Sequence, residues 1–324
     1  MVITQMTIGL IDVDNWNKLD RCFPNLPLMK ISSYYKSLGN LVEWYDPQTH
    51  YDKVYMSKVF SFTNEFTEDI NADEVIKGGT GWAISLQDGK EQFNSSKHVI
   101  LANEIEHVYP DYDLYHITDT AYGFMSRGCP RGCFFCHVKD KEGRTSYKVA
   151  DLTEFWRGQK NIKLLDPNTL ACSEWKDILQ QLIDSKAYID FTQGVDIRLM
   201  TEERIKMFLQ VKVKQVHFAW DRYQDKKLVV PKLQNFKDST GWNRSKVTVY
   251  VLTNYDTSLE QDLERVMIIR ELGFQPYIMR YDKEHIPRGS LINSLARWVN
   301  NKLIFWQCPT FEQYLNDMKQ GLWR

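Results

Sequence analysis

The chain has 324 residues, 43% of them apolar, and a formal net charge of -1 at pH 7. This length allows two ordinary domains or one large domain with a sizeable core, and the near-neutral charge excludes a protein that binds polyanions through bulk charge. No leader pattern opens the chain and no apolar run is long enough to cross a bilayer, so the sequence predicts a cytoplasmic protein without a membrane partner.

The N-terminal part alternates between strand and helix patterns. The apolar run at 6–14 ends in acidic residues and predicts a first strand, and the helical pattern at 26–39 closes at Gly39. Further strands are predicted at 41–47, 51–63 and 73–82. We therefore expect residues 1–115 to form a small doubly wound, Rossmann-like sheet followed by a connector.

After residue 116, strand and helix patterns alternate about every thirty residues, which is the length of a βαβ unit. Thr201, and Thr257 with Glu260, are expected to cap two of the helices. The six predicted strands lie at 121–129, 161–166, 188–193, 213–220, 246–254 and 275–282. This alternation predicts an α/β region over 116–285 with a parallel sheet, as a partial barrel or an open wound sheet.

The last residues, 286–324, carry helical patterns, and Thr310 with Gln313 is expected to cap the final helix. In parallel α/β sheets the chemistry gathers where the strands end at their carboxyl side. The polar residues that follow the predicted strands, and are therefore candidates for a common site, are Asp166, Asn168, Gln193, Asp196, Arg198 and Asp221.

The stretch GCPRGCFFC, residues 128–136, holds half of the six cysteines in the chain. Cysteines of a cytoplasmic protein stay reduced, so a cluster of them indicates metal or redox chemistry. Cys129, Cys133 and Cys136 have the spacing C-x3-C-x2-C, which lets one loop hold three corners of a cubic iron–sulfur cluster, while Gly128 and Gly132 permit tight turns with positive φ. Three ligands leave one iron open, and an open position is typical of a catalytic metal centre.

The alternative for this loop is a zinc site with His137 as the fourth ligand. Cys136 and His137 are adjacent, which makes it hard for both to reach one tetrahedral ion, and the usual paired cysteine knuckles are absent. The corresponding function would be a non-enzymatic zinc-binding module that meets nucleic acid through the basic segment at 222–237.

The stretch CPRGCFFC, with Phe135 in the aromatic position, resembles the signature of the radical S-adenosylmethionine (radical SAM) superfamily. The resemblance covers about residues 118–285, and RGCPRGCFFC after a wound sheet is most similar to the subgroup with an N-terminal cobalamin-binding-type domain. It implies a partial (β/α)6 barrel and a 4Fe-4S cluster on the three cysteines. It also implies an oxygen-sensitive enzyme that takes an electron from flavodoxin or ferredoxin and cleaves S-adenosylmethionine reductively.

The resemblance also suggests roles for single residues. Phe135 would lie beside the adenine of S-adenosylmethionine. The family often places Gly-Gly-Glu after the second strand, but this chain has LLDPNTL there, so Asp166 and Asn168 are the candidates for the methionyl amino group. Arg198 suits the carboxylate because its guanidinium is a planar fork.

The ribose hydroxyls have three candidate partners in this comparison, Gln193, Asp196 and Asp221. The alternative for each strand-end residue is an ordinary salt bridge. Trp220 and His217 are expected to be packing residues. No residue of the chain is assigned a catalytic role beyond binding the two cofactors.

Cobalamin is disfavoured in this chain. The subgroup supplies a histidine to cobalt after the first strand, whereas the corresponding loop here, DVDNWNKLDRCFPN, contains none. The alternative is a retained domain that shapes the substrate pocket.

The other three cysteines, Cys22, Cys172 and Cys308, are expected to be buried thiols, with Cys172 and Cys308 as second candidates for a hydrogen donor or an auxiliary ligand. The substrate is left open between a nucleotide, a nucleic acid, a peptide and a small metabolite.

Overall fold

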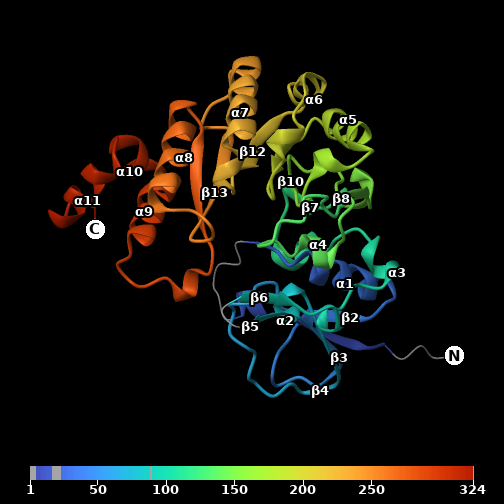
Figure 1. Cartoon of the computed structure of the whole chain (residues 1–324). Coiled ribbons are helices and arrows are strands. Elements are labelled where there is room, and N and C mark those ends of the chain that lie inside the picture. The colour runs from blue at the N-terminus through green and yellow to red at the C-terminus, as the bar shows by residue number, and fades with distance from the viewer. Residues whose placement is uncertain (1–4, 17–22, 88–89, 324) are drawn as a thin grey trace. The chain divides into compact units, whose positions relative to one another are not determined.

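The computed structural model describes residues 5–16, 23–87 and 90–323 (Figure 1). Contacts within the chain divide it into two units, which are described separately. Unit 1 consists of Met1–Thr145 and Val149–Ile162, and unit 2 consists of Ser146–Lys148 and Lys163–Arg324. None of the helices in the described part is long and apolar enough to cross a membrane.

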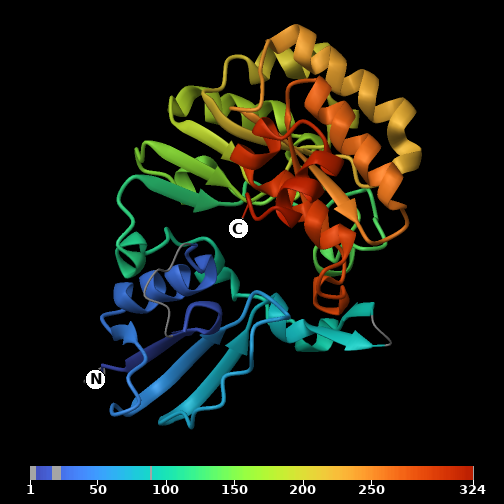
Figure 2. The same cartoon turned by 90° about the vertical axis from the view of Figure 1, so that its left-hand side faces the viewer.

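Unit 1 begins with a four-stranded sheet in the order β2-β1-β3-β4, whose neighbouring strands are parallel. Its strands are β1 (Thr7–Asp12), β2 (Leu41–Trp44), β3 (Tyr51–Ser57) and β4 (Ala72–Gly78). Helix α1 (Leu26–Ser37) contacts β1, β2 and β3 (Figure 2). Asn25 starts this helix because its side chain accepts a hydrogen bond from the Leu28 amide at 3.3 Å.

The predicted double winding of this sheet is only partly realised. A helix joins β1 to β2, but residues 45–50 and 58–71, which are fully described, join the later strands as loops. The carboxylate of Asp14 holds the second of these loops, because it accepts hydrogen bonds from the amides of Val59 at 2.5 Å and Phe60 at 3.3 Å. The parallel sheet expected at the N-terminus is confirmed, and helices in every crossover are not.

Short elements before and after the cysteines make up most of the rest of unit 1. They are α2 (Thr80–Ala83), the antiparallel hairpin of β5 (Ile84–Gln87) and β6 (Lys90–Phe93), α3 (Asn103–Glu106), β7 (Thr120–Gly123), β8 (Ser126–Arg127) and α4 (Val138–Lys141). The expected connector contains a 3-10 turn, Tyr112–Tyr115, and the hydroxyl of Tyr112 donates to the carbonyl of Phe155 at 2.7 Å.

The second large sheet has six strands in the order β14-β13-β12-β11-β10-β7, and the boundary between the units falls within β10. Its strands after β7 are β10 (Asn161–Leu164), β11 (Tyr188–Phe191), β12 (Val213–Ala219), β13 (Val247–Thr253) and β14 (Gln275–Arg280), and the two-residue β9 (Tyr147–Lys148) precedes them. The pairs from β11 to β14 are parallel. The α/β class and the six predicted strands are confirmed, whereas closure into a partial barrel stays a prediction.

Helices alternate with these strands in unit 2, as the sequence predicts. They are α5 (Trp175–Ser185), α6 (Glu202–Phe208), α7 (Lys226–Thr240) and α8 (Leu259–Glu271), followed by α9 (Leu291–Asn300), α10 (Lys302–Gln307) and α11 (Phe311–Lys319). Thr201 and Thr310 cap α6 and α11 as expected. The capping box predicted from Thr257 and Glu260 is wrong: α8 starts one residue later, and Ser258 with Gln261 forms the box. Thr257 instead donates its hydroxyl to Asp262 at 2.6 Å.

The two faces of the unit 2 sheet differ in chemistry because successive strand residues point to opposite sides. One face is aliphatic and aromatic and fully buried. Helices α6 and α7 cover it, since the Phe208 ring lies 4.9 Å from Phe191 and the Phe236 ring 4.9 Å from Phe218. The opposite face, called the polar face below, carries Asp190, Gln215, His217, Tyr250 and Tyr277.

Candidate metal centre

The cysteine loop follows β7 and β8 in unit 1 and ends at α4. Cys129, Cys133 and Cys136 are half-buried. Gly128 and Gly132 have φ of 78° and 59°, which confirms the predicted turns. A Cβ atom on Gly128 would lie 2.1 Å from the carbonyl oxygen of Thr145, so this position admits no side chain.

The base of the loop is fixed by the carboxylate of Glu142, whose side chain is 9% exposed. Glu142 accepts one hydrogen bond from the Arg127 guanidinium at 3.1 Å and one from the Gly128 amide at 3.1 Å. The Cys129 amide donates to the carbonyl of Gly143 at 3.3 Å. Residues 142 and 143 therefore close the loop against its own entrance. Sequence reasoning missed Glu142 because it is one charge in the charged run at 139–144.

The far end of the loop is tied to the β5–β6 hairpin. The Cys136 amide donates to the carbonyl of Cys133 at 3.2 Å, and a ring nitrogen of His137 lies 3.0 Å from a carboxylate oxygen of Glu91. The hydroxyl of Ser61 donates to the same carboxylate at 2.9 Å. The bond from His137 lowers the pKa of Glu91. His137 is therefore engaged with a carboxylate in this structure.

The donor set of the loop suits an iron–sulfur cluster in its chemistry. Within the described residues, no group of three or more His, Cys, Asp or Glu side chains is arranged to hold a single metal ion. A cubic cluster places its cysteine ligands on separate iron atoms, and thiolates are the ligands that such clusters use. Phe135 is half-buried in the loop, and Phe134 is 88% exposed with the Lys139 ammonium 5.2 Å from its ring.

Glu142→Gln is expected to lower the iron content of protein reconstituted with iron and sulfide without air. Glutamine keeps one acceptor but loses the charge that strengthens the bonds from Arg127 and Gly128, a loss of about 1.5–3 kcal/mol for a charged partner. Iron per chain is the measurement. Glu203→Gln, which changes a glutamate that is 60% exposed on α6, is the control. Iron content equal to that of the control would contradict the anchoring role of Glu142.

The remaining predicted site residues lie in unit 2. Asp166 and Asn168 are buried just after β10, and Gln193 is exposed after β11. The hydroxyl of Thr169 lies 3.5 Å from a carboxylate oxygen of Asp166. Burial of this pair fits a binding role as well as a structural one, and their contact with a methionyl amino group stays a prediction.

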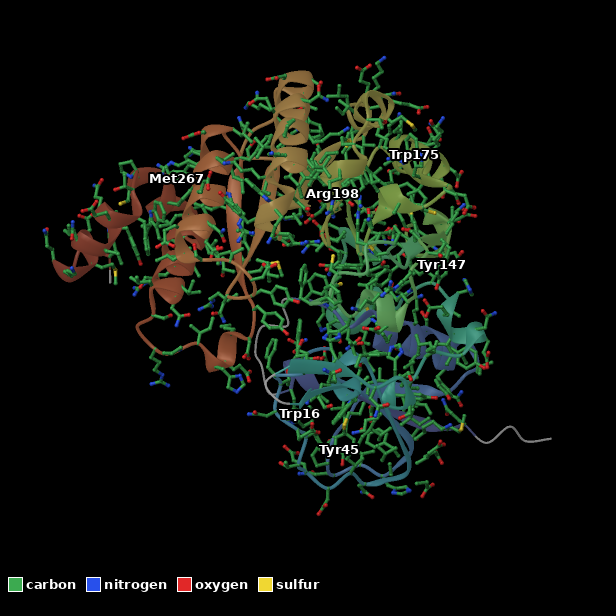
Figure 3. The ribbon with its side chains drawn as sticks, in the orientation of Figure 1. Trp16, Tyr45, Tyr147, Trp175, Arg198 and Met267 are labelled. Atoms are coloured by element: carbon green, nitrogen blue, oxygen red, sulfur yellow. The ribbon has the colours of Figure 1, made fainter. Side chains whose placement is uncertain are left out.

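Asp196 and Arg198 form the salt bridge that the sequence left open as the alternative. Figure 3 labels Arg198 in unit 2. Asp196 accepts from the Arg198 amide at 3.0 Å and from its Nε at 2.7 Å, and a second guanidinium nitrogen donates to Asp225 at 3.1 Å. One cation is thus shared by two carboxylates. Binding of a ligand carboxylate by Arg198 stays a prediction, and it requires exchange of one of these partners.

Asp221 follows β12, and its backbone carbonyl is held by Arg265 of α8. Sequence reasoning missed Arg265. The guanidinium of Arg265 is 0% exposed and donates to the carbonyls of Trp220 at 2.7 Å, Asp221 at 2.8 Å and Leu252 at 2.7 Å. It also pairs with the buried carboxylate of Asp262. Burial raises the pKa of Asp221 to about 6, although the charges of Arg265 and Arg198 act in the opposite direction. Trp220 is buried, as predicted.

The described cysteines outside the loop behave as expected. Cys172 and Cys308 are buried free thiols, and burial raises the pKa of each. Cys22 lies outside the described residues. His217 packs as predicted: its ring stacks on Tyr250 at 5.1 Å, on the polar face that also carries Asp190.

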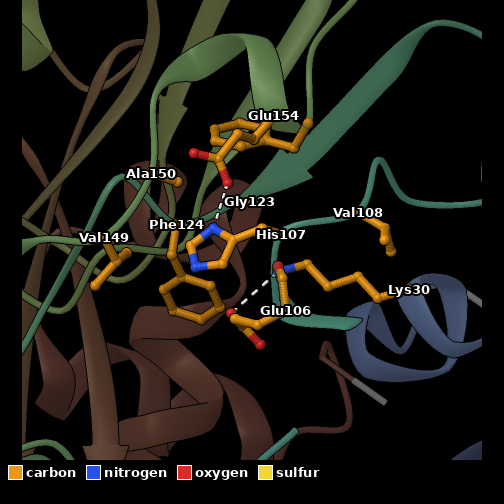
Figure 4. A pocket seen from close by; sticks show the side chains of 10 residues that line it. Lys30, Glu106, His107, Val108, Gly123, Phe124, Val149, Ala150 and Glu154 are labelled. Carbon is orange, nitrogen blue, oxygen red and sulfur yellow. Dashed lines mark hydrogen bonds and ion pairs between the residues drawn. The ribbon is translucent and has the colours of Figure 1, made fainter. Parts of the chain in front are cut away.

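Unit 1 contains a cavity that is much smaller than a cofactor site (Figure 4). Its volume is about 20 Å³, which leaves room for about one water molecule. Its wall carries the ion pair of Lys30 with Glu106 at 3.0 Å and a hydrogen bond of 2.7 Å between a ring nitrogen of His107 and the carboxylate of Glu154. This cavity is too small for cobalamin or for a substrate.

In comparisons with known proteins, neither a family model nor a curated protein matches the chain.

Proposed function

We propose that this chain is a cytoplasmic radical SAM enzyme in which Cys129, Cys133 and Cys136 hold a 4Fe-4S cluster. The observation that carries the proposal is the cysteine loop. Its C-x3-C-x2-C spacing places three thiols on one short segment, and its two positive-φ glycines include one position that tolerates no side chain. Three thiols supply three of the four irons and leave the last one to S-adenosylmethionine.

A 4Fe-4S cluster held by these cysteines would supply one electron, taken from a donor such as flavodoxin or ferredoxin, for reductive cleavage of S-adenosylmethionine and hydrogen abstraction from the substrate. The chain's own residues hold the parts in place. Glu142 closes the loop, and Arg265 fixes the carbonyls at the ends of β12 and β13. Phe135, Asp166, Asn168, Gln193, Asp196, Arg198 and Asp221 stay the candidates for contacts with S-adenosylmethionine.

The finer fold belongs to the same proposal. We infer that the six-stranded sheet and its helices form the partial (β/α)6 barrel, and that the four-stranded sheet corresponds to the cobalamin-binding-type domain of the similar subgroup. The parallel order of β11 to β14 and the parallel four-stranded sheet support this inference. Cobalamin itself stays disfavoured, since the loop DVDNWNKLDRCFPN after the first strand contains no histidine.

The test uses the full chain purified without air. We expect brown protein with about four irons per chain and broad absorption in the visible blue. With dithionite and S-adenosylmethionine it should release 5′-deoxyadenosine, and omission of dithionite is the control. Colourless protein with one zinc per chain and no 5′-deoxyadenosine would overturn the proposal and support the zinc-binding interaction module instead.

A further inference from the structure

The four-stranded sheet of unit 1 has one long outer strand. The order β2-β1-β3-β4 places β2 and β4 at its two edges. β2 has only four residues, and the Trp44 ring at its end packs edge-on against Tyr115 at 5.1 Å. β4 has seven residues, and no proline is among them. An exposed edge strand of this length can pair with a strand of another chain.

The six-stranded sheet protects its two edges with side chains. At β14, the side chain of Asn300 accepts from the Ile278 amide at 2.7 Å and donates to the Ile278 carbonyl at 3.0 Å. At β7, the hydroxyl of Tyr112 accepts from the Tyr122 amide at 2.9 Å. These edges therefore offer fewer free backbone groups to a further strand than an uncapped edge does.

Alternate residues of β4 turn their backbone groups away from the sheet. The Tyr51 amide of β3 donates to the Asn71 carbonyl at 3.0 Å, so the odd-numbered residues of β4 bond toward β3. The amides and carbonyls of Glu74 and Ile76 therefore point outward. In the part of the chain that the structure describes, no cap like those of the other sheet bonds to them. Each of these two residues thus offers a donor and an acceptor to a partner strand.

The side chains of β4 indicate which strand fits this edge. Asp73, Val75 and Lys77 share one face, and the two charges lie at equal distances from Val75. The Asp73 side chain is 69% exposed, Val75 is 37% exposed, and Lys77 is exposed as well. In an antiparallel pair of two β4 strands centred on Val75, each Asp73 lies opposite the Lys77 of the other copy. Opposite charges in directly opposed positions stabilise such a pair.

Other registers of the same pair do not match the charges. Directly opposed side chains share a face, so the twofold axis of an antiparallel pair passes at a residue. An axis at Asp73 or at Glu74 sets like charges opposite each other, and an axis at Ile76 sets Val75 opposite Lys77. The axis at Val75 pairs the whole strand and places opposite charges on both sides of the centre.

The ends of β4 leave room for this partner. Gly78 lies opposite the partner's Ala72 in the register centred on Val75, and both residues are small. Val99 lies beside this end, 3.8 Å from the position of a Cβ atom on Gly78, and it is 49% exposed. A partner strand would cover part of this apolar side chain, which adds to the pairing.

We propose that the protein forms a twofold-symmetric dimer in which the β4 strands of two copies pair antiparallel around Val75 and join the two four-stranded sheets into one. Glu74 of each copy exchanges backbone hydrogen bonds with Ile76 of the other, and the pairs of Asp73 with Lys77 flank the axis. A second copy supplies the complementary charges by symmetry, whereas an unrelated strand would need the same pattern by chance. This inference goes beyond the proposed function and does not depend on it.

The experiment measures the mass of the full chain by analytical ultracentrifugation over a range of protein concentrations. The wild type should pass from monomer to dimer as the concentration rises. Asp73→Lys should weaken the dimer about tenfold or more, because two cations then lie opposite each other, and Lys77→Asp should do the same with two carboxylates. The variant with both substitutions has opposite charges again and should dimerise like the wild type.

Two further variants separate pairing of the edge from folding. Ile76→Pro removes a backbone donor that points outward, at an edge position where proline is tolerated, and should abolish the dimer. Glu203→Lys reverses a charge that is 60% exposed on α6 and should dimerise like the wild type. Thermal unfolding checks that each variant is folded.

Two outcomes overturn the inference. The wild type stays monomeric at every concentration, or it dimerises equally with Asp73→Lys, Lys77→Asp and Ile76→Pro, which places the contact on another surface. The measurement involves neither iron nor S-adenosylmethionine, so its result is independent of whether the proposed function holds.

Discussion

Cys133→Ala is expected to abolish both the iron–sulfur cluster and the release of 5′-deoxyadenosine. Cys133 is the middle cysteine of the loop, so its loss leaves two thiols for the proposed cluster, which needs three from the protein. Iron per chain, visible absorption and 5′-deoxyadenosine formed with dithionite are the measurements. Because the chemistry depends wholly on the metal, we expect release below the detection limit rather than a partial decrease.

Cys308→Ala is the matched control for this prediction. Cys308 is a buried thiol at the end of α10 in unit 2, and its sulfur lies 3.4 Å from the carbonyl of Thr310. Its removal should leave iron content and 5′-deoxyadenosine release close to those of the wild type. If Cys133→Ala kept its release while Cys308→Ala lost it, the cluster would have to be assigned to other residues.

Asp262→Ala is expected to cost about 3–5 kcal/mol of unfolding free energy, because it leaves the charge of Arg265 buried without its partner. Both side chains are 0% exposed. The free energy of unfolding, from urea denaturation followed by circular dichroism, is the measurement. Replacing Arg265 by methionine would also be costly, for a different reason: the carbonyls of Trp220 and Leu252 would lose their donor.

The surface pair Lys176 and Glu203 provides the control for this prediction. Its two charges lie 2.6 Å apart, but the side chains are 61% and 60% exposed, so Glu203→Ala should cost less than about 1 kcal/mol. A loss at Asp262 as small as that at Glu203 would show that the Arg265 network does not stabilise the ends of β12 and β13.

The sequence predicts those features that depend on neighbours along the chain. The buried residues of α5, which are Trp175, Ile178, Leu179, Leu182 and Ile183, recur with the period of a helix, a pattern that the order of residues shows directly. Gly128 and Gly132 were predicted to have positive φ because the cysteine spacing demands a tight loop, and both do. Both features can be predicted because they depend on the spacing of residues within one short segment.

The predicted end of a strand is wrong where a side chain distant in the sequence forms hydrogen bonds with the backbone. The third strand is predicted to run to residue 63 but ends at Ser57, because Asp14 accepts the amides of Val59 and Phe60 that a longer strand would need. The strand predicted at 121–129 divides into β7 and β8, and the carbonyl of Met125 between them accepts from the amide of Val149.

The candidate site likewise contains some residues that the sequence reveals and others that it does not. The cysteines are visible in the sequence because their ligand spacing is local. Arg265 reaches carbonyls 13 to 45 residues away, and the neighbours of His217 on the polar face are fixed by strand register. Neither relation leaves a pattern in the order of residues, since both arise only when strands and helices pack.

The connector and the cysteine loop belong to the same unit as the first sheet, and this affects how the protein can be dissected. Bonds that cross residue 115 include Glu91 with His137, Glu106 with Arg127 and the hydroxyl of Tyr112 with the carbonyl of Phe155. A fragment that starts at 116 would carry every thiol of the loop but lose these partners. The cysteine loop is therefore part of the same unit as the N-terminal sheet, and a fragment that starts at 116 is not expected to hold the proposed cluster.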